Sequence, residues 1–246
     1  MSAAMSARML EISANSLGSA LAAQAGGADR VELCENLGEG GTTPSYGSIA
    51  VARDRLRIAL YVLIRPRAGD FLFDESECAV MRADIENCVR LGCDGVVIGA
   101  LDARGDIDIA LCRELIAAAG PLGVTFHRAF DAVRDQSTAL EAAIGLGCER
   151  ILTSGGANDA WSGADRIAAL SEQAGGRIAL MAGAGVTAHN IVALAQRAKV
   201  HELHASAKAP RRSAMAYRNE ALAGLSPDWV QSDAQRVAEL VAALRG

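Results

Sequence analysis

Short runs of apolar and β-branched residues alternate with longer stretches rich in Ala and Leu along almost the whole chain. This alternation is typical of βα units that build a parallel sheet. It predicts helices such as 16–25, 74–91, 137–146 and 188–197. Eight strands are expected, at residues 9–13, 30–34, 59–65, 95–99, 124–128, 150–154, 177–182 and 200–206. Eight such units predict an α/β fold, a (β/α)8 TIM barrel that spans 1–246 as a single domain, with an open doubly wound sheet as the alternative.

One joint between helix and strand recurs along the chain. A helix ends in Gly, an acidic residue follows, and a strand begins, as at 27–31, 92–96 and 147–151. Glycine adopts the left-handed conformation that commonly ends a helix. Repetition of the joint indicates one periodic architecture and not two unlike domains.

The two ends of the chain depart from the repeat. Residues 1–8 are a short extension that lacks the apolar core of a signal peptide. Residues 207–232 are irregular and basic, and we expect them to form a loop over the barrel mouth. Residues 233–246 have the apolar spacing of a helix that would close the ring.

Strand alternation separates residues that face the helices from residues that fill the barrel interior. The apolar positions mark the outside, which leaves an unusually polar set on the inside: Glu11, Ser13, Glu32, Cys34, Arg65, Thr125, His127, Glu202, His204 and Ser206. Active sites of such barrels form at the C-terminal ends of the strands. We therefore expect Glu11, Glu32, Arg65 and His127 to be catalytic, with one carboxylate as general base and His127 as acid. The alternative is a structural network in which Arg65 neutralises the two carboxylates.

A glycine-rich turn at 181–188 contains the pattern G-x-G-x-x-A between a strand and a helix. The pattern superficially matches a dinucleotide fingerprint, but it lies in the seventh unit and not in the first. A better interpretation is an anion site, as found after strands seven and eight of many barrels. Its expected donors are Gly183, Gly185, Thr153, Ser154, Gly155 and Ser206. The turn without any ligand is the simpler alternative.

Composition narrows the classes of partner. The net charge of −5 argues against nucleic acid as a binding partner. No apolar run approaches the roughly 18 residues that span a membrane, which argues against a membrane protein. Six cysteines without any C-x-x-C pair argue against a disulfide framework and against a zinc finger. A cytoplasmic protein is expected.

Several segments together identify a resemblance to the copper-homeostasis CutC family. They are Leu-Glu-Ile at 10–12, Gly-Ala-Asp-Arg-Val-Glu-Leu-Cys at 27–34, Glu-Gly-Gly-Thr-Thr-Pro-Ser at 39–45, Ile-Arg-Pro-Arg at 64–67, Phe-His-Arg-Ala-Phe-Asp at 126–131, Leu-Thr-Ser-Gly at 152–155, Gly-Ala-Gly-Val at 183–186 and Tyr-Arg-Asn at 217–219. The resemblance implies a TIM barrel, a cytoplasmic protein that binds Cu(I) through cysteines, and a homo-oligomer such as a dimer. Family members often carry a cysteine near the end of strand one, where this chain has Ser13. The ligands that remain are Cys34 with His204 or His127.

Two hypotheses about function follow. The resemblance favours a protein of copper homeostasis that binds Cu(I). The inward carboxylates and histidines favour an enzyme that acts on a small anionic or phosphorylated substrate. The copper role ranks first by family, whereas the barrel mouth has the composition of an active site, so the sequence leaves open whether the protein is an enzyme.

Overall fold

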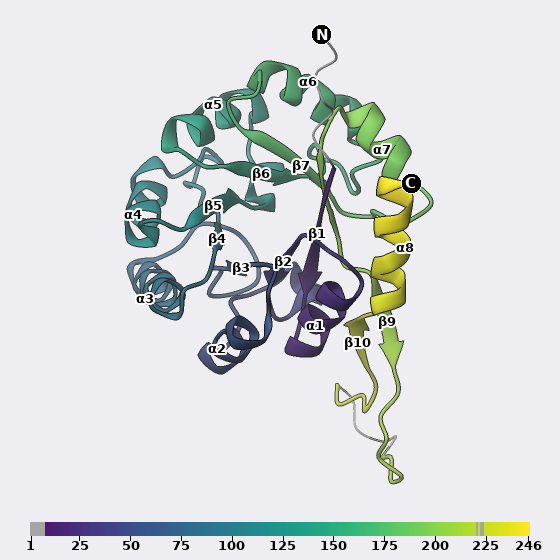
Figure 1. The fold of residues 1–246 in the computed structure, drawn as a ribbon. Helices are drawn as coiled ribbons and strands as arrows, with labels where there is room; N and C mark the ends of the chain where they lie inside the picture. The colour runs from purple at the N-terminus through teal and green to yellow at the C-terminus, as the bar shows by residue number, and fades with distance from the viewer. Residues whose placement is uncertain (1–7, 220, 222–223) are drawn as a thin grey trace.

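The computed structural model describes residues 8–219, 221 and 224–246, so most of the expected N-terminal extension lies outside the described residues. Eight parallel strands close into a barrel in sequence order, and helices surround it (Figure 1). The prediction of a (β/α)8 TIM barrel is confirmed. The barrel strands are β1 Met9–Ala14, β2 Arg30–Leu33, β3 Ala59–Leu63, β4 Gly95–Ile98, β5 Gly123–Phe126, β6 Arg150–Thr153, β7 Ala179–Gly183 and β8 Glu202–Ala205. The helices are α1 Leu17–Ala25, α2 Tyr46–Arg55, α3 Glu75–Leu91, α4 Ile109–Ala119, α5 Gln136–Leu146, α6 Ala164–Ala174, α7 Ile191–Ala198 and α8 Ala234–Arg245.

The recurring Gly-x-acid joint has two physical functions. Gly92 and Gly147 end α3 and α5 with φ of 71° and 83°, a conformation that strains residues with a side chain. Two of the acidic residues then accept a hydrogen bond from the preceding strand, Asp29 from the Leu10 N–H and Asp94 from the Leu60 N–H, both at 2.8 Å. The joint at 92–96 therefore both ends a helix and ties the next strand to its neighbour, whereas the joints at 27–31 and 147–151 each show one of these features.

Alternating side chains divide the protein into an outer core and a barrel interior. Outward residues such as Leu10, Ile12 and Val31 are fully buried between the sheet and the helices. The interior contains a small apolar cluster formed by Cys34, Tyr61, Leu63 and Val97. Most of the polar residues that form the site also point into the interior, beside apolar residues such as Met181 and Leu152.

The segment 207–232 differs from the expected loop over the mouth. Strands β9 Lys208–Arg211 and β10 Trp229–Ser232 pair as an antiparallel ribbon, which extends beyond the barrel beside α1 and α8 (Figure 1). The Asp233 N–H donates to the Ala207 carbonyl at 2.9 Å and joins the base of the ribbon. This pairing carries the chain outward and back, so only the base of the ribbon borders the mouth. Helix α8 then packs against α1 and α7. No helix in the described part of the chain is long and apolar enough to cross a membrane.

Candidate functional site at the barrel mouth

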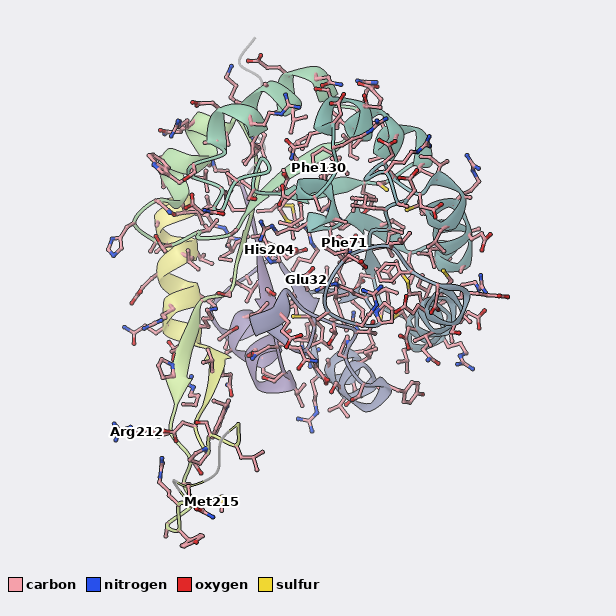
Figure 2. The ribbon with its side chains drawn as sticks, turned by 180° about the vertical axis from the view of Figure 1, so that it is seen from behind. Glu32, Phe71, Phe130, His204, Arg212 and Met215 are labelled. Atoms are coloured by element: carbon pink, nitrogen blue, oxygen red, sulfur yellow. The ribbon has the colours of Figure 1, made fainter. Side chains whose placement is uncertain are left out.

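A cavity of about 1140 Å³ opens at the C-terminal ends of the barrel strands. It is hereafter called the mouth cavity. Figure 2 shows Glu32, His204 and Phe71 close together near the centre of the ring, whereas Arg212 and Met215 lie far away on the ribbon. The ionisable residues that line the cavity are Glu32, Glu39, Arg65, His127, Arg128, Asp131, His189, His204, Lys208, Arg236 and Glu239. Glu11 is not among them, because it lies one layer deeper and is 1% exposed.

An ionic network fills the barrel below the mouth cavity. The Arg30 guanidinium pairs with Glu11 and, at 2.5 Å, with Glu202, and Arg150 pairs with the same Glu202 oxygen at 3.0 Å. Both guanidinium groups stack on the Tyr61 ring, at 5.2 and 5.1 Å from its centroid. Buried charges are tolerated only when they are paired and hydrogen-bonded in this way.

This network corrects the alternative in which Arg65 neutralises the interior carboxylates. Arg30 has that role for Glu11, and sequence reasoning missed both Arg30 and Arg150. A signal was present, because Arg30 has the same strand parity as Glu32 and therefore also points inward.

Three side chains connect the network to the mouth cavity. His204 Nδ1 lies 2.7 Å from Glu11 Oε1, and His204 Nε2 lies 3.5 Å from Glu32 Oε2. Strand pairing brings them together, because Glu11 is in register with His204 on β8 and Ser13 with Glu32 on β2. The structure thus unites two residues predicted as catalytic with one predicted as a metal ligand.

The carboxylates of Glu11 and Glu32 differ in proton affinity. Burial would raise the pKa of Glu11, but the Arg30 charge and the His204 hydrogen bond lower it to about 2. The pKa of Glu32 is raised by burial and by the Glu11 charge, although His204 partly opposes the shift. Burial also opposes the protonation of His204, yet its two carboxylate neighbours raise its pKa. Paired groups whose pKa values are driven apart are typical of acid–base sites.

His127 is a neutral hydrogen-bond donor. Its Nδ1 accepts the Ala129 N–H at 3.0 Å, so the ring proton lies on Nε2. Burial and the Arg65 charge lower its pKa to about 3. The ring fits only because Gly99 has no side chain, since a Cβ there would lie 2.4 Å from His127 Cε1. The sequence-based hypothesis required His127 to supply a proton near neutral pH. Because its ring is already neutral there, His127 does not have that role.

Arg65 is held by the backbone and not by carboxylates. Its Nη1 donates to the carbonyls of Glu39 and Gly41, and its Nη2 to the carbonyl of Gly69. Its guanidinium carbon lies 4.9 Å from the centroid of the Phe71 ring. Within the described part of the chain, Arg65 has no ion pair with a carboxylate, so its charge faces the mouth cavity uncompensated.

The predicted anion donors at 153–155 are occupied by the chain itself. The Asp131 carboxylate accepts from the Thr153 hydroxyl at 2.5 Å and from the Ser154 N–H at 3.0 Å, and the Gly155 N–H donates to the Thr153 hydroxyl. Asp131 also pairs with Arg128 at 2.7 Å. Thr153 and Ser154 thus donate to a side-chain carboxylate and Gly155 to the Thr153 hydroxyl, so these three groups are not free donors for a ligand.

The other half of the predicted anion site remains open to the mouth cavity. Gly185 and Ser206 line it, and their backbone N–H groups donate to no other group in the described residues. Gly183 has a packing role, because a Cβ there would lie 2.5 Å from Leu152 Cδ1. Lys208 brings a positive charge to the same edge.

The predicted Cu(I) ligands do not fit a copper site. Cu(I) favours thiolates, but burial and the Glu32 charge raise the pKa of Cys34 to about 12, and its sulfur lies 3.6 Å from the Ser13 hydroxyl. Both ring nitrogens of His204 face carboxylates. Among the described residues, no three His, Cys, Asp or Glu side chains are grouped so that they could hold a metal ion.

Comparisons with known proteins agree with this architecture. The model of the CutC family matches residues 8–209. A family protein CutC of Xanthomonas axonopodis pv. citri is 57% identical over 236 residues, which cover 96% of this chain and 98% of that protein. A CutC of Chromobacterium violaceum is 57% identical over 86% of this chain and 85% of its own.

Solved structures extend the comparison. The crystal structure of a CutC from Streptococcus agalactiae, named for a provisional role in copper homeostasis, is 36% identical with a TM-score of 0.78, over 81% of this chain and 98% of its own. A thiamine phosphate pyrophosphorylase from Pyrococcus furiosus, at 14% identity and a TM-score of 0.61 over 96% of this chain and 95% of its own, shares the fold.

Proposed function

The chain belongs to the CutC family, and from the geometry of its barrel mouth we propose that it is an enzyme that transfers protons to and from a small anionic substrate in the mouth cavity. The observation that carries the proposal is the chain of contacts from Glu11 through His204 to Glu32, which ends in the cavity. A structural role alone would not require a carboxylate with a raised pKa at a solvent-connected position.

Glu11, His204 and Glu32 have distinct roles in this proposal. Glu32 touches the substrate and exchanges a proton with it through a carboxylate oxygen. Its raised pKa brings its proton affinity closer to neutral pH, where acid–base catalysis is most efficient. His204 lies between the two carboxylates, which favour its protonated form beside Glu32, and Glu11 orients His204 from below. Glu11 and His204 are thus positioning residues.

An anionic substrate is supported by a cation and backbone donors of the cavity that have no acceptor of opposite charge. Arg65 has no carboxylate partner among the described residues, and the open N–H groups of Gly185 and Ser206 line the same cavity as Lys208. Anions bind readily to such combinations of free N–H groups and cations.

Ligand binding gives the first test of this function. Sugar phosphates and small carboxylic acids at millimolar concentration are expected to raise the melting temperature, because a ligand that binds only the folded state stabilises it. The neutral sugars and the corresponding amides serve as matched control ligands without the charge. Equal melting curves with the anions and with their neutral analogues would contradict the proposal.

The copper role is the second candidate, favoured by the name of the streptococcal relative and by the inward position of Cys34. Because burial raises the pKa of Cys34 to about 12, we expect its thiol to remain protonated and wild type to bind Cu(I) no more tightly than Cys34→Ser. Titration of the reduced proteins against a competing Cu(I) chelator measures this. Cys112→Ser is the control, because Cys112 is equally buried on α4 and its pKa is also about 12. Weaker binding by Cys34→Ser alone would restore the copper role.

We also propose a cytoplasmic location. Its support is the presence of free cysteines only, which is usual for proteins of reducing compartments.

A further inference from the structure

Two hydrogen-bond donors at the mouth have no partner. Arg65 Nε and His127 Nε2 are buried, and each side chain is only 5% exposed. They are the unpaired buried side-chain polar atoms of the described residues. A buried donor without an acceptor destabilises the folded protein, so such groups commonly mark a site that a ligand completes.

The two donors share one neighbour. The Phe71 ring centroid lies 4.9 Å from the Arg65 guanidinium carbon and 5.2 Å from the His127 ring centroid. Arg65 follows β3 and His127 follows β5, so both lie at C-terminal strand ends. All three residues line the mouth cavity, and Figure 2 shows Phe71 near the centre of the ring of strands and helices.

Each side chain keeps a nitrogen that has no partner. Three of the five N–H groups of Arg65 donate to backbone carbonyls, two from Nη1 and one from Nη2, whereas Nε donates to none. Nδ1 of His127 is occupied by the Ala129 N–H, which leaves Nε2–H. The pair therefore offers one unpaired nitrogen donor from each side chain, one positive charge and no acceptor.

We propose that Arg65 Nε–H and His127 Nε2–H bind one carboxylate group of the substrate, one donor to each oxygen, with Phe71 packed over it. This inference rests on the proposed function and names its substrate class, small carboxylic acids. A single cation with one unpaired nitrogen donor on each side suits a planar, singly charged group with two oxygens. A phosphate carries more negative charge than this single cation balances, and the N–H groups of Gly185 and Ser206 suit it better.

Binding at this position orients the substrate for Glu32. Glu32 lines the same cavity as both donors, so the remainder of a bound acid lies in the space that Glu32 borders. Because His127 is neutral with a pKa of about 3, its donor persists at all pH values at which the ligand is ionised.

The test compares carboxylates with isosteric controls. Isothermal titration with pyruvate and glycolate is expected to show binding to wild type, whereas glycolamide does not bind. His127→Asn keeps an oxygen near Nδ1 for the Ala129 N–H but removes Nε2–H. Arg65→Lys keeps the charge but removes Nε–H. Each variant is expected to bind glycolate about 10-fold or more weakly, since a hydrogen bond to a charged group contributes roughly 1.5–3 kcal/mol.

A spectroscopic measurement on wild type tests the same site without any variant, so it does not depend on whether the variants fold. In protein labelled with 15N at histidine, the His127 Nε2–H resonance is expected to shift on addition of glycolate and to stay unchanged with inorganic phosphate. An unchanged resonance, or equal affinity of wild type and both variants for glycolate, would overturn the carboxylate site.

Failure of this inference can be separated from failure of the proposed function. If phosphate esters bind and react with dependence on Glu32 while carboxylates do not bind, the function stands and the carboxylate site is wrong. If carboxylates bind through Arg65 and His127 but no ligand exchanges a proton with Glu32, the site stands and the function is wrong.

Discussion

Replacement of Arg30 by Met is expected to lower the free energy of unfolding by about 3–5 kcal/mol, because removal of one partner leaves buried charges uncompensated. Arg30 is 3% exposed and holds Glu11 and Glu202 together inside the barrel. Methionine replaces most of the volume but none of the charge. Urea denaturation at pH 7, analysed by linear extrapolation, measures the difference.

Arg197 on α7 offers a matched control for Arg30. It also pairs with a carboxylate, Asp165, at 2.8 Å and stacks on an aromatic ring, Trp161, at 5.2 Å, but its side chain is 39% exposed. Exposed pairs contribute only about 0–1 kcal/mol, so Arg197→Met should have a small effect. Equal losses for the two variants would show that burial of the network does not determine its energy.

The pH dependence of the Arg30 effect has a defined sign. The folded-state pKa of Glu11 is lowered from 4.5 to about 2, so its stabilisation is fully present above the unfolded value and is lost as the pH falls toward 2. In Arg30→Met the pKa of Glu11 should rise, because the charge that lowers it has gone. The stability difference between wild type and Arg30→Met should therefore shrink as the pH is lowered from about 5 to 2.

Substitution of Glu32 by Gln is expected to slow proton exchange with a bound ligand by about 10²- to 10⁴-fold, the usual contribution of a general acid–base group. The measurement is incorporation of deuterium from D2O into the C–H groups of a bound carboxylic acid or sugar phosphate, followed by NMR, which requires no knowledge of the product. Gln has nearly the shape of Glu but cannot accept the proton.

The control for Glu32 is Glu39→Gln, which removes an exposed carboxylate that lines the same cavity. It should leave the exchange rate nearly unchanged. Glu32 acts as a base in its ionised form, and its pKa is raised. The rate of deuterium incorporation should therefore rise with pH through a midpoint that lies above the ordinary pKa of a glutamate side chain. An unchanged rate in Glu32→Gln, or a rate that falls equally in Glu39→Gln, would exclude Glu32 as the proton acceptor.

The sequence by itself determined the fold. Strand alternation, the Gly-x-acid joints and eight regular βα units act locally, so they can be recognised without knowledge of tertiary contacts. Parity also located Glu11, Glu32, His127 and His204 on the inside, because the period of a strand is two residues whatever its neighbours are.

Only the tertiary structure decided how these side chains pair. Strand register placed Glu11 opposite Arg30 and His204, an arrangement that depends on the closure of β8 onto β1. The sequence could assign the carboxylates to the interior, but it could not show that Arg30 and not Arg65 neutralises Glu11.

The same limit applies to the anion donors and to the ribbon. Thr153 and Ser154 are suitable anion donors by type, yet Asp131 occupies them, because two adjacent strand ends meet in space. The segment after β8 became an antiparallel ribbon, since β9 and β10 satisfy each other's backbone groups. Residue type and spacing define which groups are available, whereas hydrogen-bond partners distant in sequence decide which of them remain free for a ligand.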